Sequence, residues 1–242
     1  MSTSTEQLHI ANLDIDVIRK DIKNMHLAVY PPTGRIRLAA PSRTDDEVIR
    51  LFAISKLAWI KRHIKNFKSQ ARETPRDFVS GESHYFQGRR FLINVIEHDG
   101  RNKVEIKNHK EINLFVKTGA SKAEKAKVFK EWYRKELKAQ IPEIIEKWEK
   151  LMGVKAHEWG VKHMRTKWGT CNTIEKRIWI NLELAKKPKN CLEYIIVHEL
   201  VHLLERSHND RFIALMNKFM PKWRAHRDEL NKLPVSHTDW GY

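Results

Sequence analysis

The segment His198-Glu199-Leu200-Val201-His202 places the strongest limit on what this chain can fold into. It lies inside residues 191–205, whose apolar positions recur at helical spacing. Residues four apart on a helix are separated by about 40° around the axis, so His198 and His202 can bind one metal ion. Glu199 lies about 100° further round, where a general base for hydrolysis belongs. Burying two histidines and a carboxylate in a helix costs desolvation free energy unless these groups bind a ligand or pair with one another. We therefore interpret the segment as a zinc site and not as a chance match on an amphipathic helix.

A zinc ion that keeps one position open for water needs a third protein ligand. His208 follows His202 by six residues, so the chain must leave the helix near residues 206–207 and fold back to bring His208 to the ion. Asn209 or Asp210 would then cap the next helix. His208 is the preferred third ligand. The alternatives are Glu205, His226 and Glu229.

The composition favours a folded protein with anionic partners. The 242 residues are 41% hydrophobic, which is enough for one large domain or two small ones. The formal net charge of +16 favours nucleic acid or nucleotides as partners, with a well-solvated surface as the alternative. Cys171 and Cys191 form no disulfide framework. No apolar run reaches membrane-spanning length and no signal pattern opens the chain, so we expect no membrane partner and a cytoplasmic location.

The pattern along the chain predicts an α+β fold with two modules. Residues 1–118 are expected to form an N-terminal β-rich accessory module that carries one helix, over about 44–69. Residues 119–242 are expected to form the metal-binding catalytic domain. Helical spacing begins near Ser121, with Pro142 as a kink or a break. Strands over 158–168 and 177–184, joined by a turn over 169–176, precede the histidine helix.

The stretch 164–172, Met-Arg-Thr-Lys-Trp-Gly-Thr-Cys-Asn, is a candidate wall of the substrate cleft. On a strand, Arg165 and Lys167 point to one side and Trp168 to the other. The strand edge could bind an extended peptide, or the cations, together with Arg211, could hold phosphate groups. An ordinary half-exposed strand is the alternative.

Several motifs in order resemble the YgjP-like metal-dependent hydrolase family, a relative of the SprT-type zinc proteins. They lie at residues 164–172, 177–188, 191–212 and 220–230, and further matches lie at 34–41, 59–64, 80–91 and 131–138, so the resemblance covers nearly the whole chain. It implies a zincin-like catalytic domain. It also implies one Zn²⁺ ion, or another divalent metal, on His198, His202 and His208, with Glu199 as the base.

The expected function is therefore a zinc-dependent, metallopeptidase-like hydrolase acting on peptides. Because some YgjP-like proteins are described as nucleoside triphosphate (UTP) pyrophosphatases, a nucleotide substrate at the same metal site is the first alternative. A nucleic-acid-associated, SprT-like zinc protein is the second alternative. A purely structural zinc site is disfavoured, because such a site has no need of Glu199 and usually takes four protein ligands.

Overall fold

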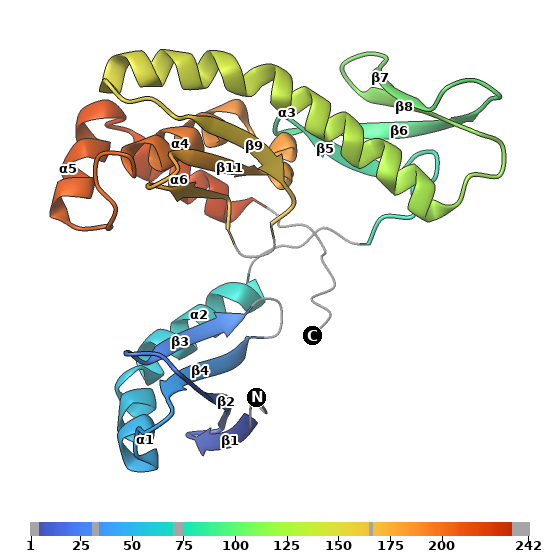
Figure 1. Ribbon diagram of the computed structural model, residues 1–242. Helices are drawn as coiled ribbons and strands as arrows, with labels where there is room; N and C mark the ends of the chain where they lie inside the picture. Colours follow the sequence, from blue (N-terminus) through green and yellow to red (C-terminus); the bar gives the residue numbers. More distant parts are fainter. Residues whose placement is uncertain (1–4, 31–33, 70–74, 165–166, 234–242) are drawn as a thin grey trace. The chain divides into compact units, whose positions relative to one another are not determined.

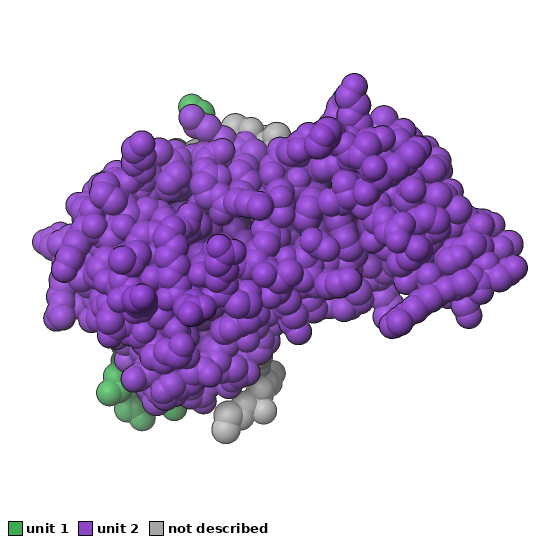
Figure 2. Space-filling model, turned by 90° about the horizontal axis from the view of Figure 1, so that it is seen from above, with its two compact units in different colours: residues 1–71, 239–242 green, residues 72–238 purple. Residues whose placement is uncertain are grey.

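The computed structural model describes residues 5–30, 34–69, 75–164 and 167–233 (Figure 1). The chain divides into two compact units, the first built from residues 1–71 and the second from residues 72–238 (Figure 2). Within the described ranges the protein is mixed α+β, with six α-helices and three small sheets that each combine parallel and antiparallel pairs. None of the described helices is both long enough and apolar enough to cross a lipid bilayer.

The first unit is a four-stranded sheet followed by two helices. Its elements are β1 (Thr5–Ile10), β2 (Leu13–Lys20), β3 (His26–Tyr30), β4 (Arg35–Pro41), α1 (Asp46–Ser55) and α2 (Leu57–Ser69), with the strand order β1-β2-β4-β3. The sequence predicts one helix here, which is wrong, because the chain breaks at Lys56. The break lets both helices share one core: Ile49 of α1 and Ile60 of α2 are buried with Ile15 and Leu38 of the sheet.

The second unit begins with another four-stranded sheet and a long helix. Its elements are β5 (Ser83–Phe86), β6 (Arg89–Glu97), β7 (Lys103–Ile106), β8 (Glu111–Val116) and α3 (Lys122–Met152). The strand order β5-β6-β8-β7 repeats the arrangement of the first sheet, including its central parallel pair. Ser121 and Glu124 form a capping box that starts α3, and Gly153 ends it at a φ of 69°. Pro142 does not divide this helix, because buried residues on both sides of it hold the helix against the core.

The β5–β8 sheet belongs to the same compact unit as the histidines. Phe86 and Ile93 of this sheet share one hydrophobic core with Leu137 of α3 and Leu200 of the histidine helix. The boundary between compact units therefore lies at residues 71/72, whereas the sequence pattern predicts a module boundary at 118/119. The local change from strands to helix near Ser121 is not a boundary in space, since α3 packs across it.

A three-stranded sheet and three helices complete the second unit. They are β9 (Glu158–Lys162), β10 (Gly169–Asn172), β11 (Arg177–Asn181), the 3₁₀ turn η1 (Leu182–Lys186), α4 (Lys189–Val201), α5 (Asp210–Phe219) and α6 (Trp223–Lys232). The strand predicted over 158–168 ends at Lys162, and the start of the predicted turn is strand β10. The sheet order is β10-β11-β9, so β10 is an edge strand.

Candidate metal centre and cleft

Three histidines converge at the carboxyl end of α4. His198 lies in the last turn of the helix and His202 is its C-cap, with φ −63° and ψ −20°. The chain then turns back, and Asn209 caps α5 by accepting a hydrogen bond from the backbone N–H of Phe212 at 3.0 Å. This return places His208 beside the other two. One ligand atom from each histidine lies within 4.8 Å of the others, and the Nε2 atoms of His198 and His208 are 3.0 Å apart.

The surroundings orient the histidine rings. His202 Nδ1 lies 3.1 Å from the carbonyl oxygen of Glu205, and a carbonyl can only accept, so Nδ1 carries the proton and Nε2 is left as the ligand atom. The Glu205 carboxylate instead accepts from the backbone N–H of Ser207. Phe212 packs against all three rings, with centroid separations of 4.6–5.0 Å. Sequence reasoning missed Phe212, although its position three residues after the expected helix cap Asn209 is a signal in the sequence.

The electrostatics of the cluster suit a metal. Burial, and then the neighbouring His202 and His208, lower the pKa of His198 to about 3, and burial also lowers the pKa of His202. Both imidazoles are therefore neutral near pH 7, which is the form that binds metal ions. His198 Nδ1 is buried and has no hydrogen-bond partner among the described residues. Three imidazole nitrogens are a suitable ligand set for a zinc ion that keeps its fourth coordination position open for water.

Glu199 is buried beside this cluster, with 4% of its surface exposed. Burial raises the pKa of its carboxyl group to about 8, and the positive charge of Lys167 acts in the opposite direction. The carboxylate lies directly against the Cα of Gly169 at the start of β10. A Cβ added to Gly169 would lie 2.6 Å from Glu199 Oε1 and 2.8 Å from its Cγ. Gly169 does not have a positive φ, so the glycine is required by this close approach and not by its backbone conformation.

A cleft of about 830 Å³ opens in front of the histidines. Its walls are β10 with the turn that follows, α4, and the end of α6. Lys167 and Trp168 are among the residues that line this cleft. Arg211 does not line it: this side chain is exposed and lies 3.9 Å from the Glu205 carboxylate. Arg165 lies outside the described residues.

Asn181 holds the segment that leads into the cleft wall. Its side chain donates to the carbonyl oxygens of Met164 (2.8 Å) and Lys167 (2.7 Å) and accepts from the backbone N–H groups of Met164 (3.3 Å) and Glu183 (3.2 Å). The residue is buried. Nothing in the local sequence marks it, because its partners are up to 17 positions away.

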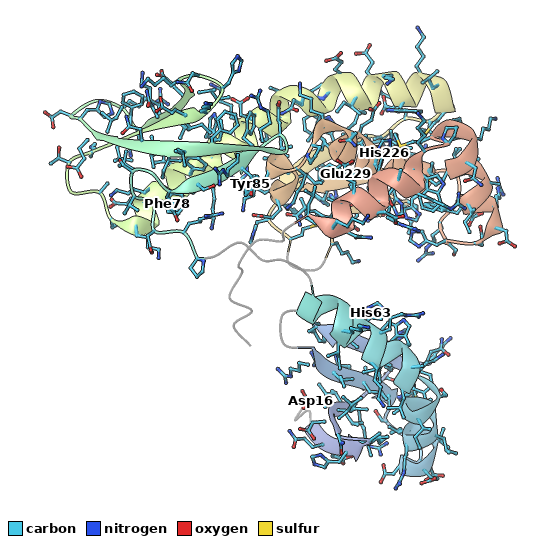
Figure 3. All side chains as sticks on the ribbon, turned by 180° about the vertical axis from the view of Figure 1, so that it is seen from behind. Asp16, His63, Phe78, Tyr85, His226 and Glu229 are labelled. Carbon is cyan, nitrogen blue, oxygen red and sulfur yellow. The ribbon has the colours of Figure 1, made fainter. Side chains whose placement is uncertain are left out.

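The alternative ligands from the later helix are engaged elsewhere. His226 and Glu229 lie on α6 (Figure 3). The side-chain amide of Asn190 lies 3.1 Å from His226 Nδ1 and donates to Glu229 Oε2 at 2.5 Å. Neither residue belongs to the group with metal-binding spacing, which in the described part of the chain consists of His198, His202 and His208.

Comparison of the chain with known proteins identifies a family model that matches it. Residues 23–233 match the family model described as YgjP-like, metallopeptidase domain. Among solved structures, the chain is similar to the metallopeptidase zymogen abylysin of Pyrococcus abyssi, with 16% identity and a TM-score of 0.35. That similarity covers 37% of this chain and 90% of the abylysin chain. No curated protein matches.

Proposed function

Since the chain belongs to the YgjP-like family, whose model covers residues 23–233, we propose that it is a zinc-dependent peptidase that hydrolyses peptide bonds in this cleft. The observation that carries the proposal is the convergence of three imidazoles beside one buried carboxylate. His198, His202 and His208 would hold the ion. When bound, zinc supplies a Lewis acid that polarises a carbonyl group and lowers the pKa of water.

Glu199 is the proposed general base. Its carboxylate accepts a proton from the attacking water and returns it to the leaving amine. The contact with Gly169 fixes where the carboxylate lies, and its burial removes competing solvent from around it. Phe212 covers the side of the histidine rings with an apolar surface.

An extended peptide is the substrate that the cleft wall fits best. Strand β10 is an edge strand, and all four of its residues line the cleft. The unpaired backbone groups of an edge strand can hydrogen-bond to an added strand, which is a common mode of peptide recognition. The phosphate-binding alternative relied in part on Arg211, which does not line the cleft; Lys167, Arg206 and Arg227 do line it, so the substrate test below includes nucleotides.

The test compares two identical substitutions on the same helix. Glu199→Gln should lower turnover by about 10²–10⁴-fold, the usual contribution of a general base, while the zinc content stays at the wild-type level. Glu193→Gln is the matched control, because Glu193 lies on α4 but bonds to Lys147 and Trp148 away from the cleft. Turnover of casein and of a panel of nucleoside triphosphates should be measured for each purified, zinc-loaded protein.

Cleavage of casein that depends on Glu199 supports the proposal. Release of phosphate or pyrophosphate that depends on Glu199, without cleavage of casein, would establish the nucleotide alternative. Loss of zinc from the Glu199→Gln protein would show that this residue holds the metal site together and would refute its assignment as the base.

A further inference from the structure

A second hollow in the second unit has a volume of about 810 Å³ and is lined by residues of the first half of α3 and of β7 with the turn before it. These two elements are labelled in Figure 1. It shares no lining residue with the metal cleft. Its charged lining residues are four cations and two carboxylates: Arg101, Lys103, Lys127, Lys135, Glu124 and Glu131.

Both carboxylates already have partners within the fold. Glu124 accepts hydrogen bonds from the backbone N–H and the hydroxyl of Ser121 in the capping box, at 2.8 and 2.7 Å. Glu131 pairs with Arg134 one turn further along α3. Of the cations, Lys103 pairs with Glu105 at 2.7 Å.

Arg101, Lys127 and Lys135 make no ion pair with any described residue, and they outnumber the Glu124 carboxylate, which is hydrogen-bonded but not neutralised. Among the described residues, none of the three has a carboxylate within 4.0 Å. Since exposed cations on a folded protein are often paired with nearby carboxylates, three unpaired ones lining one hollow give it a net positive potential.

The stability of α3 does not explain this charge. Residues 122–138 hold seven lysines or arginines against three glutamates. The amino-terminal end of a helix carries a partial positive charge, so lysines in the first turn are unfavourable for the helix itself. Lys122 is paired with Asp77 within the fold, but the excess of cations over the first half of α3 remains and suggests an anionic partner outside the fold.

We propose that this hollow, the α3–β7 groove, binds nucleic acid through its phosphate backbone and without reading base sequence. Lys127 and Lys135 are eight residues apart on one helix, a rise of about 12 Å, so they suit a polyanion that runs along α3 better than one small anion. Trp132, the aromatic residue of the lining, is 8% exposed and offers no platform for stacking a base.

An acidic protein surface is the less favoured partner. Lysine is depleted in protein–protein interfaces, which are built around exposed aromatic and apolar residues. A lysine ammonium is a compact point charge that binds phosphate without a fixed geometry. Because the groove and the metal cleft have separate linings, nucleic acid bound in the groove would leave the cleft open to its own substrate.

The test measures binding of a fluorescein-labelled DNA duplex of mixed sequence by fluorescence anisotropy over a range of salt concentrations. The groove variant is Arg101→Gln/Lys127→Gln/Lys135→Gln in the full chain. The matched control is Lys150→Gln/Lys189→Gln/Lys218→Gln, which removes the same charge from exposed positions of the same unit outside both hollows. Thermal unfolding and hydrolytic activity should be the same in all three proteins.

Each lost phosphate contact lowers the slope of log Kobs against log salt by about 0.9 for duplex DNA. The groove variant should therefore lose about 2.7 from this slope and on the order of a hundredfold in affinity at about 0.15 M salt, while the control changes little. Equal losses in the two variants would show that binding follows net charge and would overturn the proposal. So would unchanged DNA binding by the groove variant together with lost binding to polyglutamate, which would assign the groove to an acidic polypeptide.

Discussion

Substitution of Gly169 by alanine should impair catalysis without removing the metal. The new Cβ would lie 2.6 Å from Glu199 Oε1, where ordinary contact begins at 3.4 Å. The carboxylate must therefore move away from Gly169 by roughly 0.8 Å, out of the position that it holds at the cleft wall. A displacement of about 1 Å in an active site costs on the order of 10²-fold, so we expect kcat to fall by roughly tenfold to a hundredfold.

The assay pairs kcat on the best peptide substrate with zinc content measured by mass spectrometry. Gly160→Ala is the matched control. Its added Cβ would lie 2.3 Å from the ring of Trp179 in the same sheet, so it imposes a comparable clash away from Glu199. We expect Gly160→Ala to lower the free energy of unfolding while kcat stays near the wild-type value.

Two outcomes would refute the reasoning about Gly169. Wild-type kcat in Gly169→Ala would mean that the carboxylate position is not set by this contact. A loss of zinc that parallels the loss of kcat would mean that the substitution disturbs the histidines and not the base.

Three further changes test other parts of the site and its support. His208→Ala should weaken zinc binding while α4 stays folded. Because a ligand at a hundred times its Kd stabilises a protein by about 2.7 kcal/mol, a chelator should lower the Tm of the wild type but hardly that of the variant. Equal Tm shifts in the two proteins would exclude His208 as a ligand. Asn181→Ala should cost about 1–3 kcal/mol in urea unfolding and raise KM, because the segment before β10 loses its anchor; an unchanged KM would separate Asn181 from the cleft. Burial lowers the pKa of His84 below its usual 6.5, so its contribution to stability is fully present above pH 6.5 and is lost as pH falls through the folded value. As pH falls from about 7.5 to 5.5, the free energy of unfolding of the wild type should therefore drop relative to that of His84→Phe. An unchanged difference between the two proteins over this range would contradict a buried neutral imidazole.

The parts of the site that local chemistry dictates were predictable from sequence. His198, Glu199 and His202 follow from helical spacing, and the return of His208 follows from the capping residue Asn209. The supporting residues were not predictable, because their partners are distant in the chain. Gly169 and Glu199 are thirty positions apart, and only their contact in space shows why this position must be glycine.

The types of most secondary-structure elements were also predictable from sequence, whereas features that depend on tertiary packing were not. Strand and helix types follow from periodicity over most of the chain, whereas the break at Lys56 and strand β10 depend on tertiary packing. Residues 169–172 contain small and polar residues that are typical of a turn, but pairing with β11 makes them a strand. The sequence pattern changes from strands to helix at 118/119, whereas the compact units divide at 71/72, because apolar residues of α3 pack against strands that precede it.

Helix α3 ties the two ends of the second unit together. In its first half, the Tyr133 hydroxyl donates to the carbonyl oxygen of Tyr85 in β5 at 2.6 Å. Tyr85 is labelled in Figure 3. Near the end of α3, Trp148 Nε1 donates to Glu193 of α4 at 2.8 Å. The β5–β8 sheet, α3 and α4 share one hydrophobic core. Unfolding of either end of α3 would therefore expose part of the core that the other end also covers. The β5–β8 sheet and the histidine helix should therefore melt as one cooperative unit, so that the rigidity of the catalytic centre depends in part on a sheet that contributes no residue to it.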